Sequence, residues 1–137
     1  MGATMGLSHE LIHLAAAIII GIVTLIWAAA TARGQQNLAW AAGARDEAVA
    51  PPGKLAGRLD RAQANLFETL PIFAIAVIMA HVAGKDGGPL TLWGTHLYLF
   101  GRVIYLPLYA LGVAYIRTLA WGVAFVGMGM VIAALFV

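Results

Sequence analysis

Apolar residues run almost without interruption through four segments of the chain, which are separated by polar or glycine-rich connections. The segments cover approximately residues 11–32, 57–83, 90–112 and 116–137. Each is close to the roughly 20 residues that a helix needs to cross a hydrocarbon core of about 30 Å. The first segment is too uniformly apolar to bury only one face. The pattern predicts an all-α fold, an integral membrane four-helix bundle that forms one domain over residues 1–137.

The connections predict how the helices are joined and oriented. Residues 33–57 contain the breakers Pro51 and Pro52, so we expect a loop or a short interfacial excursion there. The stretch GKDGGP (84–89) predicts a tight turn, and the last connection is so short that the final two helices must be antiparallel neighbours. Lys and Arg concentrate in the first and third connections. The positive-inside bias therefore places these connections in the cytoplasm and both termini on the non-cytoplasmic side.

Composition agrees with a membrane protein and excludes several other classes. Of 137 residues, 62% are hydrophobic and 10% are charged, and the mean hydropathy is +0.89, which lies outside the soluble range. A net charge of +2 is too small to indicate nucleic-acid binding. Cysteine is absent, which excludes disulfides, thiolate metal ligands and a cysteine nucleophile. The abundance of Ala and Gly favours a bacterial inner membrane over an organellar one.

Polar side chains in the second and third segments recur at helical spacing. In the second segment, which contains RAQANLFETLPIF (61–73), one stripe carries Arg58, Arg61, Asn65 and Glu68. In the third segment, one face carries Tyr98, Arg102, Tyr105 and Tyr109. A carboxylate that faced lipid would be costly, so we expect the Glu68 stripe to lie against the Arg102 face. The structural alternative is an ion pair between Glu68 and Arg102 that only holds two helices together.

The surplus of positive charge on these two faces favours a polar ligand. Arginine forks bind carboxylates in bidentate fashion, and Glu68 is placed to receive an ammonium group. Asn65 and Gln63 are candidates for binding amides. Glutathione carries all of these groups, so we predict it as the co-substrate, together with a lipophilic small molecule that enters from the lipid bilayer. Because a subunit this small has few faces on which to hide Arg102 and Glu68, we also expect a partner subunit.

The motifs RAQANLFETLPIF and YLFGRVIYLPLYALGVAYIRT (98–118) resemble the membrane-associated proteins in eicosanoid and glutathione metabolism. The resemblance covers the second and third segments and the start of the fourth. It implies a homotrimer with glutathione at each subunit boundary, and a glutathione transferase or peroxidase activity. Together with the stripe, it gives these candidate glutathione contacts: Arg58, Arg61, Gln63, Asn65, Glu68, Arg102, Tyr105 and Tyr109.

The same resemblance implies catalytic roles for Arg117 and Tyr109. Arg117 matches the arginine thought to stabilise the glutathione thiolate, and it lies where the fourth helix begins, so the partial positive charge of the helix N-terminus adds to its own. The proton of the thiol would then pass to solvent or to Tyr109. The alternative role of Arg117 is that of a cytoplasmic topology anchor.

Two other functions compete with this hypothesis. One is a non-catalytic lipid-binding or accessory protein on the same fold. The other, more remote, is an intramembrane metalloprotease, because HELIH (9–13) matches the zinc motif H-E-x-x-H. A catalytic zinc needs three protein ligands, and nothing in the sequence fixes Asp86, His81 or His96 toward the pair. We therefore predict no metal.

The remaining small and aromatic residues of the membrane segments are interpreted mainly as packing positions. Gly21 and, in the last segment, Gly122, Gly127 and Gly129 are expected to let helices approach closely. Trp121 is a candidate for lining a substrate groove.

Overall fold

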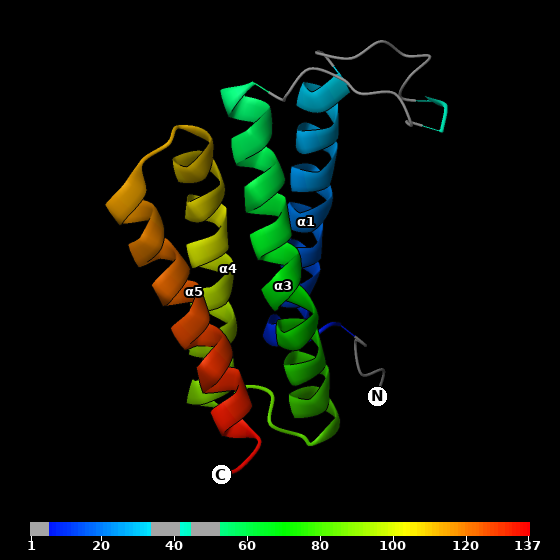
Figure 1. The fold of residues 1–137 in the computed structure, drawn as a ribbon. Helices are drawn as coiled ribbons and strands as arrows, with labels where there is room; N and C mark the ends of the chain where they lie inside the picture. The colour runs from blue at the N-terminus through cyan, green and yellow to red at the C-terminus, as the bar shows by residue number, and fades with distance from the viewer. Residues whose placement is uncertain (1–5, 34–41, 45–52) are drawn as a thin grey trace.

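The computed structural model describes residues 6–33, 42–44 and 53–137, and within these ranges the long elements are four α-helices (Figure 1). Their bounds are α1 His9–Arg33, α3 Lys54–Val82, α4 Pro89–Ala110 and α5 Ala114–Ala134. The all-α prediction is confirmed, and each helix begins one to three residues earlier than its predicted segment. The predicted excursion between the first two helices lies mostly outside the described residues.

Three of the described helices, α1, α3 and α5, are long and apolar enough to cross a membrane. Helix α4, which corresponds to the predicted segment 90–112, is not among them, although it has 22 residues; threonines, tyrosines and an arginine interrupt its apolar residues along one face. Five of these polar or aromatic side chains are buried within the bundle: Thr91, Thr95, Tyr98, Arg102 and Tyr105. The other helices therefore shield the polar face of α4 inside the same chain.

Two short turns set the antiparallel order of the last three helices. Gly84 and Gly87 adopt φ angles of 71° and 79° in the turn between α3 and α4, as the glycine-rich stretch predicted. Gly112, with φ 75°, reverses the chain between α4 and α5. The start of α1 and the end of α5 consequently lie at one end of the bundle, opposite the α4–α5 turn (Figure 1).

Helices α4 and α5 pack most closely, at three glycines. A Cβ added at Gly94 would lie 2.7 Å from the carbonyl oxygen of Gly127, and one added at Gly101 would lie 2.7 Å from that of Ala120. A Cβ at Gly127 would lie 2.5 Å from the carbonyl oxygen of Gly94. The prediction for Gly127 is therefore confirmed, whereas Gly94 and Gly101 were not singled out from the sequence.

The prediction of close packing at Gly122 and Gly129 was wrong within the chain. A Cβ added at either position would meet nothing within 4 Å, because both glycines lie on the face of α5 that turns away from α4. Gly21 does make a close contact, since its added Cβ would lie 3.3 Å from a side-chain carbon of Leu70.

The core beneath the polar residues joins α3 to α4. The rings of Phe73 and Tyr98 stack with centroids 3.8 Å apart, and both side chains are buried. The hydroxyl of Tyr98 lies 2.9 Å from Oγ1 of Thr69. Thr69 can direct its own proton to the carbonyl oxygen of Leu66, so Tyr98 is placed to donate to Thr69. This contact fixes the register of α3 against α4 one turn below the candidate site.

Candidate functional site

The polar stripe of α3 meets the polar face of α4 at Asn65 and Arg102. Nη1 of Arg102 donates to Oδ1 of Asn65 over 2.8 Å. Arg102 is only 2% exposed, and its guanidinium carbon lies 4.8 Å from the centre of the Tyr105 ring. The predicted apposition of the two faces is therefore confirmed at this point.

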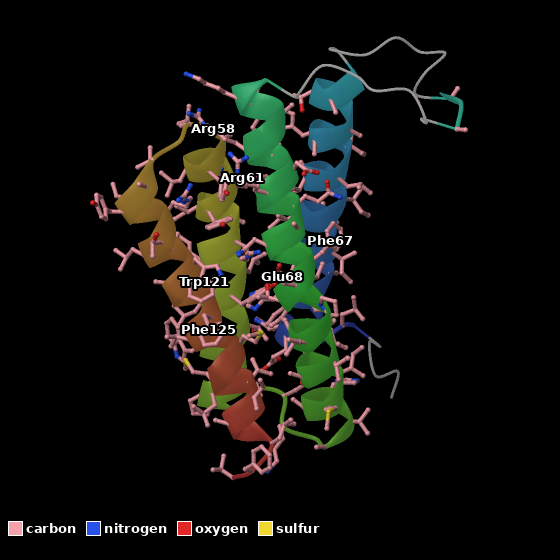
Figure 2. The ribbon with its side chains drawn as sticks, in the orientation of Figure 1. Arg58, Arg61, Phe67, Glu68, Trp121 and Phe125 are labelled. Atoms are coloured by element: carbon pink, nitrogen blue, oxygen red, sulfur yellow. The ribbon has the colours of Figure 1, made fainter. Side chains whose placement is uncertain are left out.

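Glu68 does not occupy the position expected for it. Its side chain is exposed in the single chain, and among the described residues no ion pair joins it to Arg102. Figure 2 shows Glu68 midway along α3, away from the α1 side where Phe67 lies. The interpretation of Glu68 and Arg102 as a helix-gluing pair was wrong, because Asn65, one turn earlier on the stripe, is the residue that reaches the guanidinium.

Two nitrogens of Arg102, Nε and Nη2, are buried without a hydrogen-bond partner. A buried charged donor without a partner is costly, and native proteins usually satisfy such groups. The arrangement therefore leaves positive charge directly behind Tyr105, at the base of the site.

Tyr109 lies between two cationic side chains near the α4–α5 turn. Nε of Arg61 donates to the Tyr109 hydroxyl over 3.2 Å, and the guanidinium carbon of Arg117 lies 4.4 Å from the centre of the same ring. Because the hydroxyl accepts the Arg61 hydrogen bond, its own proton is free to be donated to another group. Residues from three helices, α3, α4 and α5, thus converge on one phenol.

An open cavity of about 240 Å³ lies next to this phenol. Its lining comes from α3, α4 and α5 and consists of Asn65, Tyr105, Tyr109, Arg117, Thr118 and Trp121. Four of these residues were candidate site residues, and Trp121 had been noted as a candidate groove residue. Thr118 was missed, although it directly follows Arg117 in the motif that ends at residue 118.

Three other candidates do not line the cavity. Arg102 sits behind Tyr105, and Arg61 is exposed beside Tyr109. Gln63 is partly buried on α3. Figure 2 shows Arg61 and Arg58 near the start of α3, at the same end of the bundle as the α4–α5 turn.

Arg58 is engaged by the protein itself. Its Nη1 donates to the carbonyl oxygen of Ala110 over 3.2 Å, at the C-terminus of α4. The guanidinium also packs so closely under the turn that a Cβ added at Gly112 would lie 2.8 Å from its atoms. A cation at a helix C-terminus satisfies a free carbonyl and complements the helix dipole. Arg58 therefore has a clear structural role in holding the α4–α5 turn.

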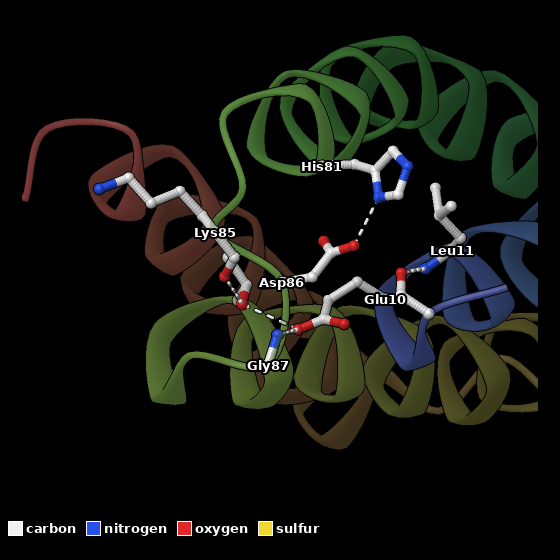
Figure 3. A network of polar contacts seen from close by, with 8 residues as sticks. Glu10, Leu11, His81, Lys85, Asp86 and Gly87 are labelled. Carbon is white, nitrogen blue, oxygen red and sulfur yellow. Dashed lines mark hydrogen bonds and ion pairs between the residues drawn. The ribbon is translucent and has the colours of Figure 1, made fainter. Parts of the chain in front are cut away.

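The residues of the HELIH motif form hydrogen bonds at the end of the bundle that lies opposite the α4–α5 turn. Glu10 is 2% exposed, and its Oε1 accepts hydrogen bonds from the backbone N–H of Gly87 over 2.7 Å and from Oγ1 of Thr91 over 2.9 Å (Figure 3). The carboxylate thus joins the start of α1 to the α3–α4 turn and to the first turn of α4. Nδ1 of His13, on α1, lies 2.8 Å from Oγ1 of Thr95, on α4.

The third-ligand candidates of that motif are arranged separately. His81 and Asp86 pair with each other over 2.5 Å, and His96 contacts the ring of His13 with centroids 5.3 Å apart. Within the part of the chain that the structure describes, no group of three His, Asp or Glu side chains is placed to hold a metal ion. Glu10 and His13 make polar contacts that join α1 to the α3–α4 turn and to α4.

Comparison with known proteins gave one finding and one absence. The sequence model of the MAPEG family, the membrane-associated proteins in eicosanoid and glutathione metabolism, matches residues 13–137, which is nearly the whole chain. The match includes all four described helices except the first residues of α1, and every residue of the cavity. No curated protein matches the chain.

Proposed function

We propose, from the premise that the chain belongs to the MAPEG family, that it is a membrane-bound glutathione transferase or peroxidase. The family consists of membrane proteins of glutathione and eicosanoid metabolism and includes glutathione transferases and related enzymes. In this proposal, the cavity next to Tyr109 binds glutathione, and the thiolate attacks a lipophilic electrophile or a lipid hydroperoxide. The host membrane is a bacterial inner membrane, with both termini on the non-cytoplasmic side.

The observation that carries the proposal is the convergence of cations on one open cavity. Arg117 lines it, Arg61 lies beside it, and the partly unsatisfied guanidinium of Arg102 lies behind it. Glutathione is an anion with two carboxylates, and guanidinium groups bind carboxylates through paired, charge-assisted hydrogen bonds. Asn65 supplies an amide at the same place for the peptide groups of the ligand.

The size of the cavity favours a site completed by a second subunit. Small-molecule sites usually measure about 300–1,000 Å³, which is larger than the cavity in the single chain. A bound tripeptide would extend beyond the lining residues over α3, where Arg61 and Glu68 are exposed. A neighbouring subunit in a homotrimer would cover this extension and shield Glu68 from lipid.

The chemistry assigned to the site rests on Arg117 and Tyr109. A thiol with a reference pKa of about 8.5 is mostly protonated at neutral pH, so the catalyst must stabilise the thiolate. Arg117 belongs to the first turns of α5, where the helix N-terminus adds positive charge. It stays protonated at neutral pH and therefore acts electrostatically. In this proposal, the O–H of Tyr109, whose oxygen accepts the hydrogen bond from Arg61, donates its own hydrogen bond to the sulfur.

Titration of glutathione into the detergent-solubilised protein, followed by calorimetry, tests the proposal. We expect saturable binding that weakens at least about tenfold in Arg61→Ala and Glu68→Gln, as for charge-assisted contacts removed from water. Arg117→Ala should still bind glutathione, but with less ultraviolet absorbance from the thiolate and slower conjugation. Lys54→Ala is the control, because Lys54 is an exposed cation at the first residue of α3. Parent-like binding in both Arg61→Ala and Glu68→Gln would place the site elsewhere.

A further inference from the structure

The start of α5 carries Arg117 but is not packed into the bundle. Ala120 is the first residue of α5 that is buried, and Tyr115 and Leu119 before it are 91% and 70% exposed. The residue at the N-cap is Val113, whose apolar side chain cannot hydrogen-bond the first N–H groups of the helix. The direction in which this part of α5 runs is therefore set mainly by the turn that precedes it.

Arg58 reaches that turn from α3. The N–H groups of residues 111–113 donate to the carbonyl oxygens of Pro107, Leu108 and Tyr109. Nη1 of Arg58 donates to the next carbonyl oxygen, that of Ala110, over 3.2 Å. Ala110 is buried beside Leu59 of α3, where a charge-assisted hydrogen bond is screened little by water. A side chain from α3 thus completes the hydrogen bonding at the end of α4.

The guanidinium of Arg58 also fits closely against Gly112. A Cβ added at Gly112 would lie 2.8 Å from Cζ and Nη2 of Arg58 and 3.1 Å from its Nη1. Gly112 has a φ of 75°, which residues with a side chain rarely adopt. Because Gly112 has no side chain, the guanidinium can lie directly against the turn, two residues before α5 begins. Figure 2 shows Arg58 at the start of α3, beside the α4–α5 turn.

We propose that Arg58 is a positioning residue for the glutathione thiolate: it holds the α4–α5 turn, and through the turn it keeps Arg117 beside the sulfur. The inference rests on the proposed function and on the electrostatic role of Arg117 in it. Arg117 lies over the Tyr109 ring, and Arg61, one turn after Arg58, donates to the Tyr109 hydroxyl. One arginine of α3 therefore holds the backbone of the turn, and the next holds the ring on which Arg117 lies.

This role differs from the direct glutathione contact that the sequence predicted for Arg58. The residues that line the cavity in the described structure do not include Arg58, and its guanidinium is bound to the turn. The attraction between Arg117 and a thiolate falls as the distance between them grows, and small displacements in a catalytic site have large effects on rate. Loss of Arg58 should therefore weaken the stabilisation of the thiolate more than it weakens the binding of the thiol.

Replacement of Arg58 tests the proposal through the state of the bound thiol. In Arg58→Met, we expect the pKa of bound glutathione, read from thiolate absorbance against pH, to rise by about one unit toward the free value. Turnover of a model aryl halide below that pKa should fall about tenfold, in step with the thiolate fraction. Arg58→Lys keeps a cation that can donate to the carbonyl oxygen, so it should lie closer to the parent. Lys54→Met, which removes an exposed positive charge from the same end of α3, is the matched control.

Affinity distinguishes positioning from direct contact. It is measured about two pH units below the thiol pKa of the parent complex, where glutathione binds as a thiol, so that lost thiolate stabilisation does not enter the dissociation constant. The Kd of Arg58→Met should stay within about twofold of the parent value. A guanidinium that held a glutathione carboxylate would instead raise the Kd at least about tenfold on removal. That result, with an unchanged thiol pKa, would overturn the proposal.

Gly112→Ala breaks the same contact from the other side. Its new Cβ would displace the Arg58 guanidinium, so we expect a similar rise in the thiol pKa. Because both substitutions remove one interaction, the double variant of Arg58→Met and Gly112→Ala should raise the thiol pKa no further than the larger single change. Additive effects would show that the two residues act separately and would contradict the proposed contact.

Hydrogen exchange of the ligand-free protein separates this inference from the proposed function. Amide protons of residues 117–120, the first that donate within α5, should exchange at least about threefold faster in Arg58→Met than in the parent. Amides of residues 124–131, where α5 is packed on α4, should keep their rates. Parent-like exchange, or a parent-like thiol pKa and turnover in Arg58→Met, would overturn the positioning role. Absence of glutathione binding by the parent would overturn the proposed function, and the exchange rates would still decide whether Arg58 holds the start of α5.

Discussion

At the scale of single residues, Arg102 shows how this protein holds positive charge in its interior. Nη1 of the guanidinium is bound to Asn65 and its face lies on Tyr105, yet Nε and Nη2 have no partner. Burial of a charge costs several kcal/mol unless hydrogen bonds compensate for it. A buried guanidinium with unsatisfied nitrogens lowers the free energy of unfolding of the ligand-free protein. A bound anion would offset part of that loss.

Replacement of Arg102 by methionine should therefore change the thermal stability of the ligand-free protein and its affinity for glutathione in opposite directions. Without ligand, we expect Arg102→Met to unfold at a higher temperature than the parent, by an amount equivalent to roughly 1–2 kcal/mol, because an apolar side chain of similar length replaces the unsatisfied charge. Glutathione affinity should fall at least about tenfold. Thermal unfolding in detergent with and without glutathione measures both effects. A lower melting temperature for the ligand-free variant would show that Arg102 is already satisfied in the protein.

At the scale of secondary structure, the close contact of α4 with α5 positions the two halves of the cavity. Tyr105 and Tyr109 come from α4, and Arg117 and Trp121 come from α5. The backbones can approach at Gly94, Gly101 and Gly127 only because no side chain lies between them. In a membrane, such close packing supplies much of the attraction between helices. At the turn, Arg58 bonds the end of α4 and fixes the direction in which α5 begins.

The glycines of α5 provide a matched pair of substitutions. Gly127→Ala should destabilise the protein by about 2 kcal/mol or more, because the new Cβ would lie 2.5 Å from a backbone oxygen of α4 and the helices would have to separate. Gly129→Ala adds the same methyl group into open space, and alanine favours a helix by up to about 1 kcal/mol over glycine. We expect it to be neutral or stabilising. Denaturation followed by circular dichroism, with glutathione binding as a second readout, would test this, and equal losses in both variants would contradict it.

At the scale of the whole molecule, the exposed Glu68 bears on the proposed assembly. The carboxylate lies about 10 Å along α3 from Arg61, well inside a helix that is apolar enough to span the membrane. A charged side chain that faces lipid near the centre of a span costs on the order of 3 kcal/mol. A second copy of the chain, together with glutathione, would remove this cost, which agrees with the proposed homotrimer.

Two measurements test the assembly. Native mass spectrometry in mild detergent should show a trimer, and the absence of cysteine from the chain makes single-cysteine cross-linking unambiguous. Ala64→Cys, one turn before Glu68 on an exposed part of α3, should form disulfide-linked dimers on oxidation, whereas Phe100→Cys on α4 should not. Monomers in the mass spectrum together with no cross-link at Ala64 would count against a subunit boundary at Glu68.

The sequence by itself determined the class of the protein, its helices and several of the residues that line the cavity. Apolar segments of about 20 residues must be helical in lipid, because every backbone polar group has to be satisfied within the segment. The glycine-rich turn and the short last connection then fixed an antiparallel order. Residue spacing also put Asn65 on one stripe and Arg102 and Tyr109 on one face, and these stripes do meet.

Only the tertiary structure decided which members of the two faces touch. Helical periodicity gives the direction of a side chain around its own axis, but it gives neither the rotation nor the axial position of one helix relative to another. Those are set by close packing at Gly94, Gly101 and Gly127, and by buried contacts such as Tyr98 with Thr69. As a result, Arg102 binds Asn65 and leaves Glu68 exposed.

Long-range polar contacts also could not be predicted from the sequence. Arg58 donates to a carbonyl oxygen 52 residues away, and Glu10 accepts a hydrogen bond from a backbone N–H 77 residues away. Neither partner is marked by a motif, because the two groups are backbone groups that every residue except proline possesses. The carbonyl oxygen of Ala110 lies at the end of α4 and the N–H of Gly87 lies in the turn before α4, and only the packed bundle brings Arg58 and Glu10 to those two positions.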